Sequence, residues 1–98
     1  MKKEKTCRGF GVINFKDEYN IPCSLQKSSL ATEDAIWLGV DDPKPQILAY
    51  HINGGIPNGW VKYDIPKEVN LHTRMHLTRE QVKELLPHLK KFVETGEI

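Results

Sequence analysis

The chain has 98 residues, enough for one domain with a single modest core, so we expect one domain over residues 1–98. Fourteen lysines and arginines stand against thirteen acidic residues, and this near balance disfavours duplex nucleic acid as a partner. Two cysteines without paired spacing predict a reduced, cytoplasmic compartment. No apolar run reaches the roughly 20 residues of a membrane helix, so no membrane span is expected.

The first third of the chain predicts a charged start and then a β-hairpin. Residues 1–6 show no periodicity, and we expect them to be frayed. Residues 10–15 alternate like a strand, turn residues follow at 17–20, and residues 22–29 read as the returning strand. Alternation divides the returning strand between two faces: Cys23, Leu25 and Lys27 share one, and Ser24, Gln26 and Ser28 share the other.

The middle of the chain predicts further strands. Residues 30–40 fit either a short capped helical turn or a polar loop followed by a strand, and the β-branched and aromatic residues near their end favour the strand. Residues 46–52 and 60–65 are two more strand candidates. The glycine-rich stretch between them, residues 53–59, is expected to be a flexible loop.

The C-terminal third predicts one strand and one helix. Residues 71–77 alternate like a strand, with basic side chains on one face: His72, Arg74 and His76. Thr78 and Gln81 form a capping box, which starts a helix. Apolar residues then recur at helical spacing and form one stripe: Val82, Leu85, Leu86, Leu89, Phe92 and Val93.

These elements predict an α+β fold, with an antiparallel sheet of about five to six strands and one C-terminal helix packed on one face. The apolar stripe is expected to be buried against the sheet face that carries Met75 and Leu77. Pro87 interrupts the helical hydrogen bonding, and we expect a kink there in a helix that nevertheless continues. Because a small domain with open strand edges gains stability by pairing, we also expect a homo-oligomer.

No motif for catalysis or metal binding stands in the sequence. His72 and His76 are four residues apart, which on a strand separates the side chains by about 13 Å. Neither cysteine nor any other histidine supplies the rest of a tetrahedral zinc site. The serines and cysteines have no base at a recognisable local spacing. We therefore expect no catalytic residues, no metal and no cofactor.

Basic, hydroxyl and aromatic side chains from three segments predict a site for an anionic ligand that carries a base. Arginine offers a planar fork for phosphate, and histidine adds a donor. The hydroxyl-rich stretch resembles both a phosphate loop and an ordinary capped turn. A tryptophan serves as a stacking surface or as a core anchor. For Arg74 and His76, together with His72, the alternative is a solvated sheet face. The candidate site residues are Lys27, Ser28, Ser29, Trp37, Arg74 and His76.

Two blocks of sequence resemble a family of small, mostly uncharacterised accessory proteins of tailed bacteriophages and prophages. They are CSLQKSSLATEDAIWLGVDD at residues 23–42 and HTRMHLTREQVKELLPHLKKFVETGEI at residues 72–98, together about half of the chain. The resemblance implies a phage protein that acts in the host cytoplasm, and it brings no catalytic residues with it.

The residues and the resemblance together give two hypotheses for function. The first is a non-enzymatic, homo-oligomeric protein that binds a small nucleotide-like ligand and sequesters a host immune signal. The alternative is a protein that binds and inhibits a host defence or regulatory protein, through an exposed sheet edge or the glycine-rich loop. A nucleic-acid-associated role is disfavoured by the net charge of +1.

Overall fold

The computed structural model describes residues 1–53 and 59–98. The chain divides into two compact units, one formed by Met1–Asp41 with Arg74–Ile98 and the other by Asp42–Thr73. The loop expected at residues 53–59 falls largely on residues 54–58, which lie outside the described part of the chain.

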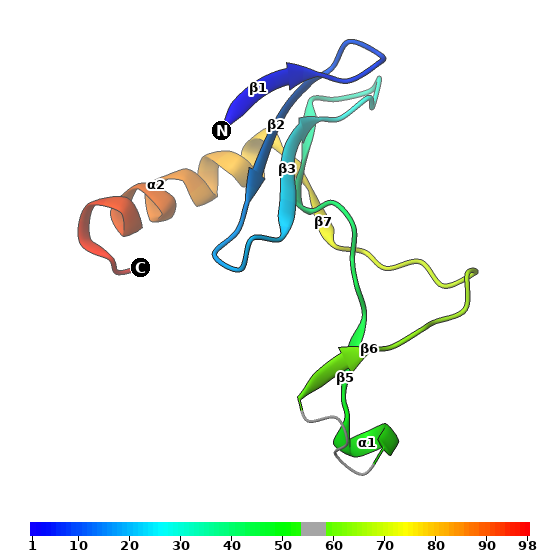
Figure 1. Cartoon of the computed structure of the whole chain (residues 1–98). Coiled ribbons are helices and arrows are strands. Elements are labelled where there is room, and N and C mark those ends of the chain that lie inside the picture. The colour runs from blue at the N-terminus through cyan, green and yellow to red at the C-terminus, as the bar shows by residue number, and fades with distance from the viewer. Residues whose placement is uncertain (54–58) are drawn as a thin grey trace. The chain divides into compact units, whose positions relative to one another are not determined.

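The larger unit is built on a five-stranded antiparallel sheet with the strand order β1-β2-β3-β4-β7 (Figure 1). Four strands follow one another along the chain, and the fifth returns to pair with β4. The strands are β1 (Lys2–Lys5), β2 (Gly11–Lys16), β3 (Pro22–Lys27), β4 (Ala35–Val40) and β7 (Arg74–Thr78). Helix α2 (Arg79–Thr95) follows β7 at once. The expected α+β class, with an antiparallel sheet and a C-terminal helix, is confirmed.

Turn chemistry explains the hairpin between β2 and β3. The Asp17 carboxylate accepts hydrogen bonds from the backbone N–H groups of Tyr19 at 2.8 Å and Ile21 at 3.0 Å. Asn20 adopts a φ of 62°, the left-handed conformation that asparagine tolerates better than most residues. The segment at residues 17–20 is therefore a turn, as its composition predicts.

The N-terminal segment differs from its expected fraying, because Lys2–Lys5 forms edge strand β1. Backbone groups pair it with β2, and the Asn14 amide donates a hydrogen bond to the Glu4 carboxylate at 3.3 Å, so the pairing does not need the apolar periodicity that the segment lacks. The backbone N–H and side chain of Thr6 both bond Phe10, which closes the connection. All four residues of β1 are exposed, and lysines on an exposed edge discourage further strand pairing.

The register gives the sheet one polar and one apolar face. Gln26, Trp37 and His76 are paired across β3, β4 and β7, so their side chains share a face, which we call the polar face. The alternate positions form the apolar face, where neighbouring strands present Ile13, Phe15, Leu25, Ile36, Leu38, Met75 and Leu77. The division of β3 between two faces therefore matches the sequence prediction.

Helix α2 begins and ends where its capping residues predict. The Thr78 hydroxyl accepts a hydrogen bond from the backbone N–H of Gln81 at 3.2 Å. The Gln81 side chain in turn accepts one from the backbone N–H of Thr78 at 3.0 Å. At the other end Gly96 adopts a φ of 76°, and its N–H bonds the Phe92 carbonyl. The helix continues through Pro87.

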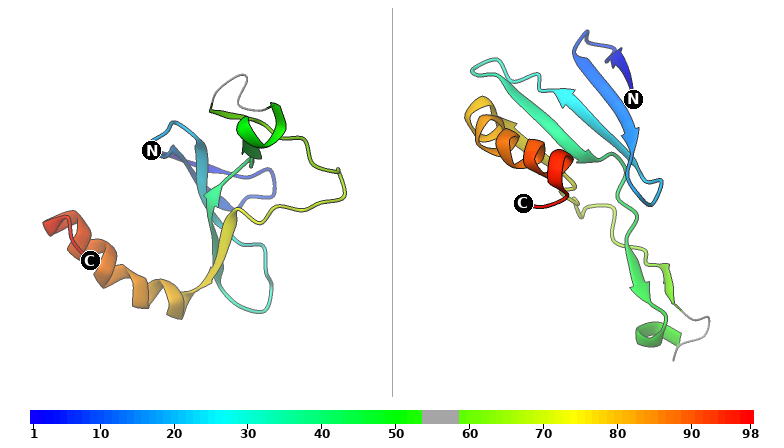
Figure 2. Two further views of the ribbon diagram at one scale, coloured as in Figure 1. Left: turned by 90° about the horizontal axis from the view of Figure 1, so that it is seen from below. Right: turned by 90° about the vertical axis from the view of Figure 1, so that its left-hand side faces the viewer.

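The expected burial of the apolar stripe of α2 is wrong for the chain by itself. Leu86, Leu89 and Phe92 are 59%, 57% and 56% exposed, and no residue of α2 is buried. The reason lies in the connection: β7 ends at Thr78 and α2 starts at Arg79, so no loop turns the helix back over the sheet. The helix instead runs outward from the end of β7 (Figure 2).

The smaller unit is a two-stranded antiparallel sheet with one helical turn. Strand β5 (Gln46–Leu48) pairs with β6 (Trp60–Lys62), so both strands are shorter than the sequence predicts. The expected strand over residues 46–52 is corrected, because its end forms the short helix α1 (Tyr50–Asn53). Ala49 between them is fully buried, and a small residue there allows the sharp change of direction. Within residues 1–53 and 59–98, no helix is long and apolar enough to cross a membrane.

Candidate functional site

The polar face brings together an aromatic ring, an imidazole and a guanidinium. Trp37 on β4 lies opposite His76 on β7, and their rings stack with centroids 4.0 Å apart and planes 14° from parallel. The Arg74 guanidinium lies 5.4 Å from the centre of the Trp37 ring, within the range of a cation–π contact. Trp37 is thus half-buried under side chains of its own sheet, with one ring face covered by His76.

Two polar side chains of the β3 segment hold these groups in place. Gln26 accepts a hydrogen bond from Arg74 at 3.1 Å between Oε1 and Nη1. Ser28, directly after β3, is 4% exposed, and its Oγ lies 3.0 Å from Nε2 of His76. The backbone N–H of Ser28 donates to the Ala35 carbonyl at 2.9 Å, which fixes the position of the hydroxyl. Because Arg74 and His76 are each held by a partner, their orientation is defined before any ligand arrives.

The sequence predicts four of the five side chains that meet on the polar face, and Gln26 is the one that it does not predict. Ser28, Trp37, Arg74 and His76 are brought together as expected. Gln26 was missed, although its alternation with Ser24 and Ser28 already placed it on the same face. His72 precedes β7 and belongs to the smaller unit.

Lys27 and Ser29 are not part of this arrangement. Lys27 lies on the other side of β3, as strand alternation requires, and its Nζ forms an ion pair with Asp34 at 2.9 Å. Ser29 is exposed in the loop that follows β3. The expectation that Lys27 converges with Arg74 and His76 is therefore not met, because neighbouring residues of a strand point to opposite faces.

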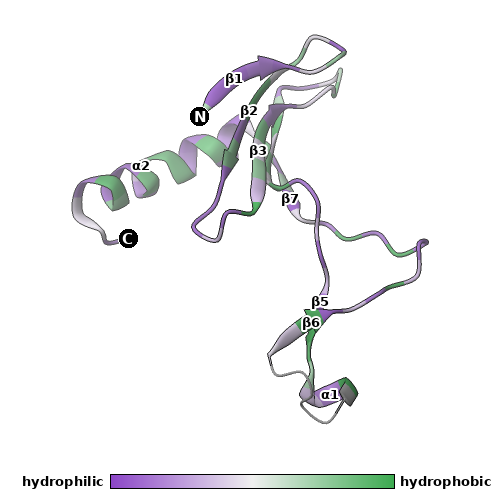
Figure 3. Ribbon diagram, in the orientation of Figure 1, coloured by the Kyte–Doolittle hydropathy of each residue, from purple (hydrophilic) through white to green (hydrophobic). Residues whose placement is uncertain are grey.

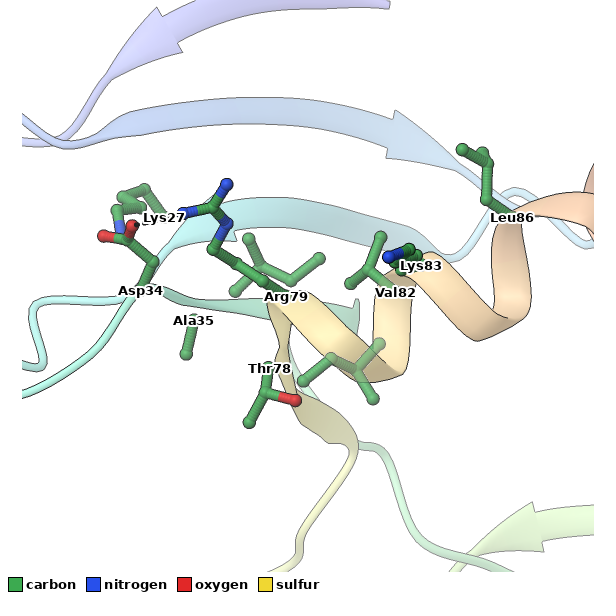
Figure 4. A pocket seen from close by; sticks show the side chains of 10 residues that line it. Lys27, Asp34, Ala35, Thr78, Arg79, Val82, Lys83 and Leu86 are labelled. Atoms are coloured by element: carbon green, nitrogen blue, oxygen red, sulfur yellow. Dashed lines mark hydrogen bonds and ion pairs between the residues drawn. The ribbon is translucent and has the colours of Figure 1, made fainter.

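A groove on the opposite side of the sheet lies between β4 and the first turns of α2 (Figure 4). It has a volume of about 520 Å³ and an apolar lining that includes Ile36, Leu77, Val82 and Leu86. Its rim is charged, because Asp34 pairs with Lys27 and lies 3.7 Å from the Arg79 guanidinium. The hydrogen bond and charge of Lys27, with a further contribution from Arg79, hold the pKa of Asp34 below its ordinary value.

The thiol on β3 is in an environment that suppresses reactivity. Cys23 is 5% exposed, and burial together with the negative charges of Asp17 and Asp41 raises the pKa of its thiol. Asp41 also accepts a hydrogen bond from the buried Ser24 hydroxyl. Among residues 1–53 and 59–98, no group of three histidine, cysteine or acidic side chains is arranged to hold a metal ion.

Comparisons with known proteins add no relative. No protein-family model matches the chain, and no match is found among curated proteins or solved structures.

Proposed function

We propose that the chain binds a small anionic, nucleotide-like ligand on its polar face and holds it without converting it. The observation that supports this most is the contact between Arg74, Trp37 and His76, which joins a cation to stacked rings on one surface. Nucleotides combine the two complementary features, a phosphate and a flat base.

The hydrogen bonding of the polar face leaves capacity for an anion. The guanidinium of Arg74 has five N–H donors, and Gln26 takes one of them. A phosphate oxygen beside Arg74 would gain charge-assisted hydrogen bonds, each contributing roughly 1.5–3 kcal/mol. A base has two options at the rings: it stacks on the exposed His76, or it displaces His76 from Trp37.

Binding without turnover fits the residues of this cluster. Gln26, Ser28, Trp37, Arg74 and His76 include no carboxylate to orient the imidazole as a general base. The hydroxyl of Ser28 is buried and lies beside His76, and its own backbone is fixed by Ala35. The cluster therefore offers donors and ring surfaces, which suit retention of a ligand better than chemistry on it.

The biological role that we propose rests on the resemblance to phage accessory proteins. Such a protein, acting in the cytoplasm of the host, would lower the free concentration of an immune signalling nucleotide by binding it. Sequestration requires stoichiometric amounts and tight binding, and it requires no catalytic residue. The bound nucleotide must then be recoverable unchanged.

Calorimetric titration of cyclic dinucleotides and cyclic ADP-ribose isomers tests the proposal. Arg74→Ala should weaken binding by about one to two orders of magnitude, since it removes the charge-assisted hydrogen bonds. Arg79→Ala is the matched control, because Arg79 is 82% exposed at the groove rim on the other side of the sheet. Wild-type protein that binds none of these nucleotides would refute the proposal. Equal losses in the two variants would place the site elsewhere.

A further inference from the structure

The larger unit leaves two apolar surfaces uncovered. One is the stripe of α2, where Leu86, Leu89 and Phe92 are each more than half exposed. Hydrophobic and hydrophilic residues alternate along this helix (Figure 3). The other is the apolar face of the sheet, where Met75 is 55% exposed. Only three hydrophobic residues are buried in the part of the chain that the structure describes: Cys23, Ala35 and Ala49. A core made of such small residues does not account for a stable fold by itself.

The side chains left exposed in the larger unit are large enough to form an interface. The stripe of α2 exposes five of them by 42% to 83%: Leu85, Leu86, Leu89, Phe92 and Val93. A standard protein interface takes about 800 Å² from each partner. Because these residues and Met75 all belong to the larger unit, an interface built on them needs no contribution from the smaller one.

The two apolar surfaces complement each other, yet one chain does not join them. The 17 residues of α2 extend for about 25 Å, and the helix contacts the sheet mainly at β7, the strand from which it emerges, with its first turns beside β4. Since no residue separates β7 from α2, the helix has no linker with which to fold back. A second copy carries the same pair of surfaces on separate elements, and a two-fold axis lets each helix cover the sheet of the other copy.

We propose that two copies of the chain form a symmetric dimer in which the apolar stripe of each α2 packs on the apolar face of the partner's sheet. The groove lined by Ile36, Leu77 and Val82 receives apolar side chains from the distal half of the incoming helix. Leu89 and Phe92 are the large side chains that this half presents. The polar face with Arg74 and His76 lies on the opposite side of each sheet, so dimer formation leaves it accessible. This inference does not depend on the proposed function.

Sedimentation equilibrium of the full chain tests the dimer. Wild type should sediment as a species of twice 11.3 kDa at micromolar concentration. Leu89→Lys should shift the equilibrium toward the monomer by at least a hundredfold, because it places a charge in the centre of the stripe. Glu94→Lys is the matched control: it adds the same side chain to the same helix outside the stripe, and it should remain dimeric. A monomeric wild type, or a Leu89→Lys variant that dimerises as well as wild type, would overturn the proposal.

Cysteine cross-linking tests the exchanged geometry and does not depend on a destabilising charge. In a Cys7→Ser background, Leu89→Cys and Leu38→Cys chains are mixed and then oxidised. The proposal expects a disulfide between the two different chains, since the helix of one lies on the sheet of the other. A disulfide formed only between two Leu89→Cys chains would indicate helix-to-helix pairing and overturn the exchange. Co-purification of wild type with a host protein in place of its own dimer would overturn it as well.

Discussion

Replacing Thr78 by alanine should loosen the first turns of α2. Thr78 provides both halves of the capping box, with hydrogen bonds of 3.2 Å and 3.0 Å to Gln81. The alanine variant loses the side-chain acceptor for the Gln81 N–H and keeps the backbone N–H that donates to the Gln81 side chain. The cost of losing an N-cap is about 1 kcal/mol, within a range of 0.5–2.

The cost of losing the cap matters because interactions within the helix carry an unusually large share of the stability of α2 in the single chain. None of its residues is buried, and its main contact with the sheet is at β7. One to two kcal/mol therefore changes the ratio of folded to frayed first turns by about 5- to 30-fold. The backbone pairing of Thr78 with Ala35 at the end of β7 does not involve the side chain, so the sheet should be unaffected.

Native-state hydrogen exchange of the backbone amides measures the effect directly. In Thr78→Ala, amides in the first two turns of α2 should exchange about 5- to 30-fold faster, while amides of β3 keep their rates. Thr78→Ser is the matched control, because serine retains the hydroxyl and should preserve the wild-type rates. Unchanged exchange in the alanine variant would show that the helix is held by packing instead of by its cap. Dimerisation through α2 would then have to be tight at the concentration used.

Two further predictions concern an ion pair and a turn. Lys27→Met should raise the pKa of the Asp34 carboxyl toward 3.8, as measured by NMR titration. Because that pKa is depressed in the folded chain, the ion pair stabilises the fold above pH 3.8. This stabilisation is lost as the pH falls through the lower pKa of the folded chain. Lys62→Met, which removes a lysine paired with Asp64, should leave the Asp34 titration unchanged. Asn20→Ala should lower the free energy of unfolding by about 1 kcal/mol in urea denaturation, because alanine tolerates the φ of 62° poorly, and Asn20→Gly should not. Equal stability of these two turn variants would contradict the role assigned to the backbone conformation.

Elements with a local physical cause could be predicted from the sequence. The capping box at Thr78 and Gln81 depends on two residues three positions apart, and it forms as predicted. The alternation of β3 assigns each side chain to a face without knowledge of its neighbours, and the register agrees. The polar cluster follows from the same alternation applied to Arg74 and His76, once β7 is known to pair with β4.

Elements that depend on partners distant in sequence could not be predicted in the same way. Strand β1 has no apolar periodicity and forms because β2 offers an edge to pair with. The stripe of α2 has the pattern of a buried helix, but pattern alone does not say which chain supplies the covering surface. The absence of a linker between Thr78 and Arg79 was visible only when both element boundaries were known. Lys27 and Ser28 are adjacent in the sequence and suggest one motif, but strand geometry places their side chains on opposite faces of the sheet.

The position of Pro87 agrees with a helix that is covered along its stripe by another surface. At 100° per residue, Pro87 lies on the side of α2 opposite Leu89, away from the stripe. Proline cannot bond the Lys83 carbonyl and crowds it, and on this side of the helix water can satisfy the freed carbonyl. A helix opened on its polar side curves with its apolar side concave, as helices that wrap around a core do. A proline within the stripe would instead place an unpaired carbonyl on the apolar side, so the position of Pro87 is compatible with the helix exchange proposed above.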